Sequence, residues 1–312
     1  MIGAWPCLPR LSRGAWATPD ESGQIGGSTE PLLRCYQARM IPRLDSSLAW
    51  QTATRLVSTN RDMLLAIAGV FFLLPGLAFS VFVPEPQMPP GTSPEKMMEI
   101  IAEAWTSSMP LLVIVTLLQM AGTVTMLIVM TDPARPTVGQ AIQRGFKALL
   151  PYVIAQIIVG GALGLAFLVL VSLSALTGLQ ALAAFVIVAA FVAMIWCSLR
   201  MALVAPVLAI EAERNPVQAL RRSWALTRGN SGRLLAFFIL AGVVFAIVYG
   251  LAMMLVGIVL VLMTGGGVQQ VLTAAVSSAI TSAALVYFIA ILAAVYRQMA
   301  GPPQNEVTGI FE

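Results

Sequence analysis

Apolar residues are gathered along the chain into six long runs separated by short polar segments. Each run reaches the roughly 20 residues that a helix needs to cross the hydrocarbon core of a bilayer. Segments of about ten residues with strict two-residue alternation, the pattern of a membrane β-barrel, do not occur. The pattern therefore predicts an all-α polytopic membrane bundle with six transmembrane helices. The runs are, in chain order, Met63–Val83, Pro110–Met130, Pro151–Leu176, Ala181–Val204, Leu234–Met263 and Val271–Tyr296.

Short connections indicate how neighbouring runs pack. The third and fourth runs are separated by a turn around Thr177-Gly178, and the last two by Thr264-Gly-Gly-Gly267. A connection of a few residues leaves two helices antiparallel and adjacent. We therefore expect two helical hairpins in the second half of the membrane region.

Between the apolar runs, one seven-residue pattern occurs twice. The segment Gln140–Phe146 returns 78 residues later as Gln218–Trp224. A helix-start residue precedes each copy, Thr137 before the first and Asn215 before the second. Within each copy, apolar residues share one helical face and basic residues lie on the other. The repeat predicts two amphipathic helices that lie in the cytoplasmic membrane interface and lead into the next hairpin.

The ends of these helices, and a third copy, are also suggested by the sequence. Pro151 is expected to separate the first amphipathic helix from its span, and Gly229 to cap the second in a left-handed conformation. The segment Asn60–Ala66 can be laid on Asn230–Ala236, with Leu48–Trp50 upstream. This weaker match would give three parallel units, each with two spans.

A further helix is expected in the loop after the first run. Ser93 and Pro94 start it, and its apolar side includes Met97 and Trp105. Three glutamates form the other side, so the helix should rest on the outer membrane surface or cap the bundle. A lid over a ligand is the alternative interpretation. The glutamates are Glu95, Glu99 and Glu103.

Composition and charge support a membrane protein and set its orientation. Apolar residues make up 58% of the chain and charged residues only 10%, with a mean hydropathy of +0.87. The net charge of +4 comes from arginines in short loops beside the apolar runs, so it does not indicate nucleic-acid binding. Because these loops fall on one side of the membrane, both termini are expected to be cytoplasmic.

The chain divides into three parts by composition. Residues 1–39 are rich in Pro, Gly, Ser and Arg and are expected to be a disordered cytoplasmic tail. A translation start at Met40 is the alternative. Residues 40–300 form the six-span membrane domain, and residues 301–312 a short cytoplasmic tail.

Residues that could support catalysis are scarce. There is no histidine, which excludes a Ser-His-Asp triad and the commonest metal ligand. The three cysteines, Cys7, Cys35 and Cys197, form no disulfide framework. No phosphate-binding glycine loop and no paired carboxylates occur in a span. We therefore expect no enzymatic activity, no cofactor and no metal.

A few features within the runs have two interpretations. Arg200 either reaches from the end of the fourth span to the interface or marks a functional site. Gln119, Thr123 and Tyr249 either bond neighbouring helices or line a permeation path. Pro206 should kink or stop the fourth span. The glycine cluster Gly160-Gly161-Ala162-Leu163-Gly164 should allow close helix packing.

Two stretches resemble a known family. Arg200-Met-Ala-Leu-Val-Ala-Pro206, followed by Glu211, and Ala219-Leu-Arg-Arg-Ser-Trp224-Ala-Leu-Thr-Arg-Gly229 are similar to the glycerophosphoryl diester phosphodiesterase membrane domain family. The resemblance covers roughly residues 45–300 and implies a bacterial protein. It implies no enzyme, because the family's hydrolase is a separate soluble barrel that uses histidines and acidic metal ligands.

The expected function is that of a bacterial inner-membrane protein without catalysis, with an accessory or scaffold role in membrane and phospholipid handling. Its partners would be lipids with anionic headgroups or a membrane protein, bound through Arg144, Lys147, Arg221, Arg222, Trp224 and Arg228. The alternative is a transporter or channel for a small or lipid-like solute, with a cavity lined by Gln119, Thr123, Arg200 and Tyr249. A membrane enzyme is a third interpretation, for which candidate residues are missing.

Overall fold

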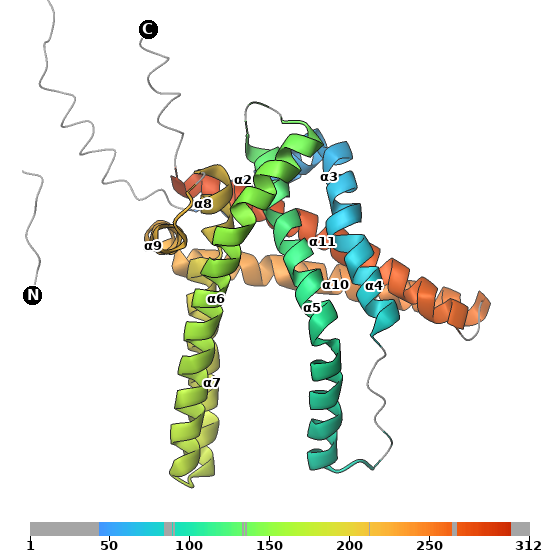
Figure 1. Cartoon of the computed structure of the whole chain (residues 1–312), viewed down its shortest axis with the longest axis vertical. Coiled ribbons are helices and arrows are strands. Elements are labelled where there is room, and N and C mark those ends of the chain that lie inside the picture. Colours follow the sequence, from blue (N-terminus) through green and yellow to red (C-terminus); the bar gives the residue numbers. More distant parts are fainter. Residues whose placement is uncertain are drawn as a thin grey trace, which may run out of the picture. The chain divides into compact units, whose positions relative to one another are not determined.

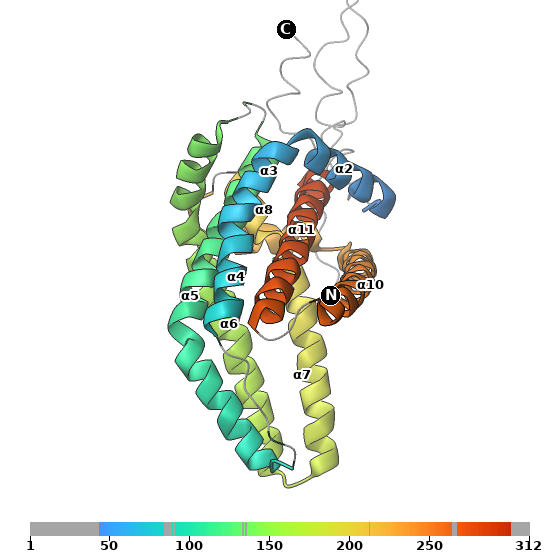
Figure 2. The same cartoon turned by 90° about the vertical axis from the view of Figure 1, so that its right-hand side faces the viewer.

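The computed structural model describes residues 44–300, apart from 84–88, 90, 133, 135, 212 and 264–266. Every regular element in this part of the chain is a helix (Figures 1 and 2). Six helical segments are long and apolar enough to cross a membrane, which confirms the predicted six-span bundle of a multi-pass membrane protein. The predictions for the tails 1–39 and 301–312, for Met40 and for the glycine turn at 264–266 lie outside the described residues.

The first span contains a local change of helix type. It consists of α3 (Arg61–Ala68), the π-helical turn η1 (Gly69–Leu73) and α4 (Leu74–Phe82). The N–H of Leu74 bonds the carbonyl of Gly69, five residues back. Pro75 follows directly, and it has no N–H to continue the α-helical ladder. The proline therefore accounts for the widened turn before it.

The outer helix and the second span form one element, and the prediction of a separate surface helix was wrong. Helix α5 runs without a break over Pro94–Thr131, and Pro110 lies inside it. The predicted start is correct, since the hydroxyl of Ser93 accepts a hydrogen bond from the N–H of Lys96. An internal proline removes one backbone bond but need not end a helix whose remaining turns are intact.

The same correction applies to the third span. Helix α6 covers Val138–Leu176, so Pro151 does not separate an amphipathic helix from a membrane helix. A turn with Gly178 in a left-handed conformation (φ +68°) leads to α7 (Gln180–Met201). Helices α6 and α7 pack along each other, which confirms the expected hairpin (Figure 1).

The fourth span ends as Pro206 requires. After Met201 the helix breaks at Ala202 and Leu203, and a short helix α8 (Val204–Ile210) follows. Proline at position 206 cannot donate to the carbonyl four residues earlier, and its ring would clash with that carbonyl. The break therefore falls at the residue that the proline leaves without a donor.

The last three helices follow the expected pattern. They are α9 (Pro216–Thr227), α10 (Ser231–Met263) and α11 (Gly267–Ala300). The side chain of Asn215 accepts hydrogen bonds from the N–H groups of Val217 and Gln218, so it caps α9. Gly229 follows the helix with φ +91°, which confirms the predicted left-handed cap.

A third copy of the amphipathic helix is present, in the same register as the other two. It is α2 (Ser46–Thr59). Asp45, Thr137 and Asn215 start the three helices and accept side-chain bonds from their first turns. The fourth residue of each helix is a fully buried alanine (Ala49, Ala141, Ala219). The eighth is a small, buried residue (Ala53, Gly145, Ser223).

The three units are arranged cyclically. Each unit consists of an amphipathic helix, a first span and a second span. The first part of α6 packs on α5, the second span of the preceding unit, and α9 likewise packs on the end of the fourth span, at α7 and α8. Helix α2 packs on α11, the second span of the last unit (Figure 2). The amphipathic helices therefore join each unit to the one before it and close the ring.

The core lies where the second spans meet. Helices α5, α8 and α11 contact one another, and about half of the residues in the apolar stretches of α5 and α11 are buried. Helices α7 and α10 contribute much less, since the buried apolar residues are Ala190 on α7 and Leu234, Phe237 and Ala241 on α10. The glycine cluster of α6 does not pack closely within the chain, contrary to expectation, because nothing lies within 4 Å of a Cβ built on Gly160, Gly161 or Gly164.

Candidate membrane-interface site

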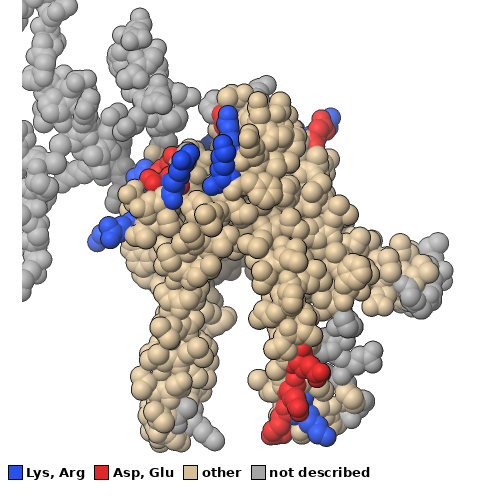
Figure 3. All heavy atoms as spheres, viewed as in Figure 1, with Lys and Arg blue, Asp and Glu red and all other residues tan. Residues whose placement is uncertain are grey.

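The predicted interface residues lie where each amphipathic helix meets the second span before it. We call these places the first junction (α5 with α6), the second junction (α7 and α8 with α9) and the third junction (α11 with α2). Figure 3 shows basic side chains gathered over this end of the bundle and acidic ones at the start of α5. The junctions therefore place the amphipathic helices and most of the positive charge together.

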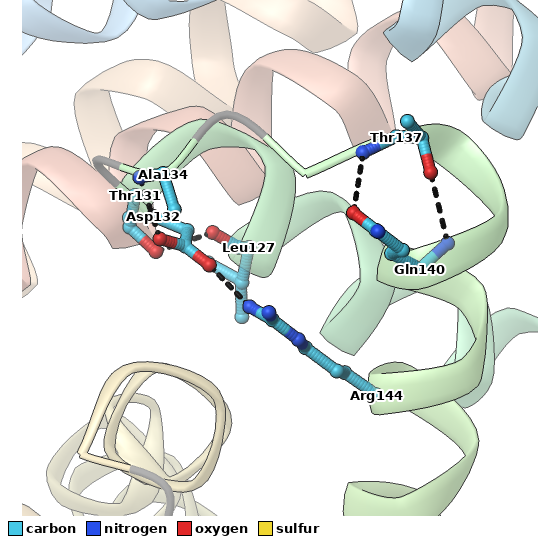
Figure 4. A network of polar contacts seen from close by, with 7 residues as sticks. All are labelled: Leu127, Thr131, Asp132, Ala134, Thr137, Gln140 and Arg144. Carbon is cyan, nitrogen blue, oxygen red and sulfur yellow. Dashed lines mark hydrogen bonds and ion pairs between the residues drawn. The ribbon is translucent and has the colours of Figure 1, made fainter.

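At the first junction, an ion pair and a close backbone approach hold α6 against α5. The guanidinium of Arg144 pairs with the carboxylate of Asp132, which also accepts from the N–H of Ala134 at 2.9 Å (Figure 4). A Cβ on Gly145 would overlap Thr125 Oγ1. The ring of Phe146 lies 6.5 Å from that of Phe71, between centroids.

The start of α6 shows the predicted capping box. The N–H of Gln140 donates to Thr137 Oγ1 at 3.4 Å, and the N–H of Thr137 donates to Gln140 Oε1 at 3.2 Å (Figure 4). These reciprocal bonds satisfy two N–H groups that a helix start would otherwise leave without partners. They fix the turn from which Arg144 reaches back to Asp132.

The second junction repeats this arrangement. Arg222, 78 residues after Arg144, pairs through Nε with Glu211 at 3.1 Å. Ser223, at the position of Gly145, donates its hydroxyl to the carbonyl of Arg200 at 2.7 Å. This bond ties the eighth residue of α9 to the end of α7, where the fourth span is interrupted. The arginine and its acidic partner therefore match those of the first junction. The small residue that follows differs, because Ser223 has a hydroxyl where Gly145 has no side chain.

The third junction uses amide bonds in place of an ion pair. The N–H of Asp45 donates to Gln298 Oε1 at 3.1 Å, and Gln298 Nε2 donates to the carbonyl of Asp45 at 3.2 Å. Trp50 stacks on Tyr287 at 6.4 Å. Hydrogen bonds from Leu48 and Ser47 lower the pKa of the Asp45 carboxyl below its usual value, because they stabilise the ionised form.

Three consecutive residues at the end of α11 each bind another unit. Tyr296 donates its hydroxyl to Glu211 at 2.6 Å. Arg297 Nη2 donates to the carbonyls of Met130 and Thr131 at 3.3 and 3.4 Å. Gln298 binds the start of α2 as described above. The end of α11 therefore ties the three junctions together.

The second junction also contains a feature that we call the arginine corner, formed by Arg200, Trp196 and Trp224. The guanidinium carbon of Arg200 lies 4.1 Å from the ring centroid of Trp196 and 4.4 Å from that of Trp224. The two indoles meet edge to face at 5.8 Å, with their planes at 90°. Cation–π attraction holds the guanidinium against both rings.

The predicted interface residues separate into two groups. Arg144, Arg222 and Trp224 are engaged within the chain, in the two ion pairs and in the arginine corner. Lys147, Arg221 and Arg228 are exposed, and their side chains make no hydrogen bond or ion pair with the rest of the described chain. The second group is therefore available for an anionic partner.

The predicted intramembrane residues are not brought together. The hydroxyl of Thr123 bonds the carbonyl of Gln119 in its own helix at 2.8 Å. Tyr249 on α10 pairs with Ser277 on α11 at 3.0 Å, and Arg200 lies in the arginine corner. Helices α5 and α10 share no extended contact. Each residue has a local role in this structure.

A crevice of about 330 Å³ lies between α6, α7, α8 and α11, and sequence reasoning did not locate it. Its polar lining is Tyr152, Gln156 and Ser198, and Gln156 Nε2 donates to the Tyr152 hydroxyl at 3.2 Å. None of the four predicted intramembrane residues lines it. In the described residues, no three His, Cys, Asp or Glu side chains lie close enough together to hold a metal ion.

Several junction residues were missed by sequence reasoning. Trp196, Tyr296 and Gln298 lie in or beside apolar runs, where single polar or aromatic residues carry little positional information. The two ion pairs did have a signal in the sequence. An acidic residue precedes the arginine of each copy by eleven or twelve positions, as in Asp132 with Arg144 and Glu211 with Arg222.

Comparison with protein-family models, with curated proteins and with solved structures finds no match to this chain. The internal repeat, the junction chemistry and the membrane setting are therefore the features that bear on function.

Proposed function

We propose that this chain is a bacterial inner-membrane protein with both termini cytoplasmic, and that it binds anionic phospholipid headgroups at its junctions. In this role it has no catalytic activity of its own and acts as an accessory or scaffold in phospholipid handling. A membrane protein recruited through the same surface is a further partner that this role allows.

One observation carries the proposal, namely the exposed cations Lys147 and Arg221 on amphipathic helices whose opposite faces are anchored, with Arg228 directly after the second of these helices. Buried alanines at the fourth position hold each helix against a second span. A basic helix fixed beside spanning helices lies at the depth of the phosphate groups, where each Lys or Arg is worth about 1 kcal/mol of attraction to anionic lipid.

The assignment to the bacterial inner membrane has a different basis. It is supported by the resemblance of Arg200–Pro206 and Ala219–Gly229 to the membrane domain family named above. The orientation is supported by the arginines of the junctions, because positive loops are retained on the cytoplasmic side.

The transporter alternative has less support from the geometry. Thr123, Tyr249 and Arg200 each bind a neighbour in a different part of the bundle, and the second spans meet in a packed core. A path along the crevice between α6 and α11 would have to use other residues, among them Tyr152 and Gln156.

The test is lipid retention by the full-length protein. Native mass spectrometry from micelles doped with phosphatidylglycerol and phosphatidylcholine would count the lipids that stay bound. The double variant Arg221→Glu/Arg228→Glu should lose most of the preference for phosphatidylglycerol, since each reversal removes one attraction and adds a repulsion. The matched control Arg55→Glu changes an exposed arginine of α2 outside the proposed set. Equal retention in the double variant and the wild type would contradict the proposal.

A further inference from the structure

We infer that the arginine corner is a binding site for one phosphate-ester oxyanion, with Arg200 as the charged ligand. The inference deepens the proposed function, because it assigns a specific residue and ligand chemistry to one junction. A phospholipid headgroup and a soluble phosphate compound share this chemistry, and the experiment below separates them.

The charge of Arg200 has no counter-ion among the described residues. The three ion pairs in the described chain join Arg61 to Asp62, Arg144 to Asp132 and Arg222 to Glu211. Arg200 takes part in none of them, although it lies in the last turn of a membrane-spanning helix. An anion from outside the chain would supply the counter-charge that the described chain does not.

The donors of Arg200 are also unused within the described part of the chain. Its Nε is buried and has no hydrogen-bond partner in the described chain. Arginines in a last helical turn often bond the terminal carbonyls. Here the Arg200 carbonyl is taken by the Ser223 hydroxyl, and the guanidinium makes no such bond. The residue as a whole is only half-buried, so its Nη groups can be reached from outside.

The guanidinium donors of Arg200 are held in place before any ligand arrives. Trp196, one helical turn before Arg200, and Trp224 of α9 hold the guanidinium carbon at 4.1 and 4.4 Å. The Ser223 bond fixes α9 to the same residue. A planar guanidinium that is already oriented loses less entropy on binding and can offer two parallel N–H groups to a phosphate.

The depth of the site suits a lipid phosphate. Tryptophan side chains favour the headgroup level of a bilayer. The indoles of Trp196 and Trp224 each carry an N–H donor, and neither makes a hydrogen bond with the rest of the described chain. The corner thus combines a cation, neutral donors and apolar ring faces, as a phosphate attached to acyl chains requires.

The experiment measures phosphatidylglycerol binding to the full-length protein in detergent micelles by native mass spectrometry. Dioleoylglycerol, which has the same chains without the phosphate, is the matched lipid. Arg200→Gln removes the charge and the planar donor pair, and should weaken binding of the tightest phosphatidylglycerol about tenfold. Arg200→Lys keeps the charge without the planar pair, and should weaken it about threefold. Dioleoylglycerol binding should not change.

The control Arg55→Gln removes one exposed positive charge elsewhere and should change affinity by less than about twofold. Equal affinity in Arg200→Gln and wild type, or equal losses in Arg200→Gln and Arg55→Gln, would overturn the inference. If Arg200→Gln fails to fold, the comparison of Arg200→Lys with wild type decides, because unchanged affinity in Arg200→Lys then overturns the planar-donor site.

A second series identifies the source of the phosphate. Inorganic phosphate at millimolar concentration, with chloride at equal ionic strength as the control, should leave the lipid in place if the headgroup is the ligand. Displacement by phosphate alone supports the oxyanion site and assigns it to a soluble phosphate compound. Should Arg200→Gln bind normally while Arg221→Glu/Arg228→Glu does not, the inference fails and the proposed function stands. Loss in neither variant contradicts both.

Discussion

The first and second junctions have the same framework and different chemistry. In both, the seventh residue of the amphipathic helix is an arginine paired with the acidic end of the preceding span, and the eighth is small and buried. The ninth is aromatic. At the first junction it is Phe146, which faces another phenylalanine. At the second it is Trp224, which faces a tryptophan and Arg200.

The difference separates architecture from function within one repeat. Features present at both junctions are explained by the need to attach a helix to a span. The arginine corner is present at only one of them, so attachment does not explain it. The first junction therefore serves as an internal control for the second, and substitutions at matched positions can break or sharpen the comparison.

The largest effect is expected where the helices approach most closely. Gly145→Ala would place a methyl group into Thr125, and should lower the free energy of unfolding by about 2 kcal/mol through overpacking. Gly139, in the same helix, has nothing within 4 Å, and Gly139→Ala should instead stabilise by about 0.5–1 kcal/mol. SDS-induced unfolding in mixed micelles measures both. Similar values for the two variants would show that the approach is not needed.

The second largest effect on the free energy of unfolding is expected at Ser223, which occupies the position of Gly145 in the second junction. Ser223→Ala removes the buried hydroxyl that donates to the Arg200 carbonyl, and should lower stability by about 1–2 kcal/mol in the same unfolding assay. Ser58→Ala is the control, because Ser58 is exposed and bonds only a carbonyl of its own helix. A neutral Ser223→Ala would mean that water replaces the hydroxyl.

The aromatic position tests the difference between the junctions directly. Trp224→Leu removes one of the two rings on Arg200 and should lower stability by about 1 kcal/mol more than Phe146→Leu, through loss of the cation–π contact. Adding Arg200→Gln to each variant completes the comparison. The extra loss in Trp224→Leu should disappear in that background, and its persistence would mean that packing alone accounts for it.

The ion pairs are expected to contribute little. Both are partly exposed, so Arg144→Gln and Arg222→Gln should each lower stability by only about 0.5 kcal/mol, and by less at high salt. The second junction should tolerate the loss better, because Glu211 still accepts from Tyr296. The measurement is the free energy of unfolding of each variant and of the wild type at low and at high salt, where the smaller loss is expected for Arg222→Gln. A loss of several kcal/mol in either would show that the carboxylate is less hydrated than its exposure indicates.

The smallest effect concerns pH at the third junction. The folded pKa of Asp45 is below the unfolded value of 3.8, so its ionised form contributes stability above that value. This contribution decreases as the pH falls from about 5 through 3.8 toward the folded pKa. Thermal unfolding of wild type and Asp45→Asn between pH 6 and pH 3 should converge at the acidic end. Parallel curves would contradict the assignment.

Much of this architecture could be predicted from hydrophobic periodicity and helix caps. The six spans, the hairpin at Gly178, the capping box at Thr137 and the cap at Gly229 all follow from local rules. The prolines show where local rules stop. Pro206 interrupts its helix, whereas Pro110 and Pro151 do not. Whether a helix continues through a proline depends on its tertiary neighbours, which the local sequence does not contain.

The third copy and the arginine corner show a different limit. The third copy was predicted from the match of Asn60–Ala66 with Asn230–Ala236, which has the same register as α2 on α9. The cap and the small residues at positions four and eight, such as Asp45 and Ala49, are a further signal that this match did not use. The sequence predicts Arg200 as an intramembrane site residue and Trp224 as an interface residue, and it gives no role to Trp196. Only the packing of α9 on the end of α7 shows that the three belong to one site.

The closure of α2 on α11 has a consequence for biosynthesis. Asp45 and Gln298 are 253 positions apart, so the first helix of the membrane domain to leave the ribosome waits for the last one. Until α11 is inserted, the anchoring face of α2 has no partner, and the ends of α5 and α8 lack their contacts with Arg297 and Tyr296. Assembly of this ring is therefore completed only after the whole membrane domain has been synthesised. A chain truncated before α11 lacks the third junction, and its first and second junctions lack the bonds from Arg297 and Tyr296.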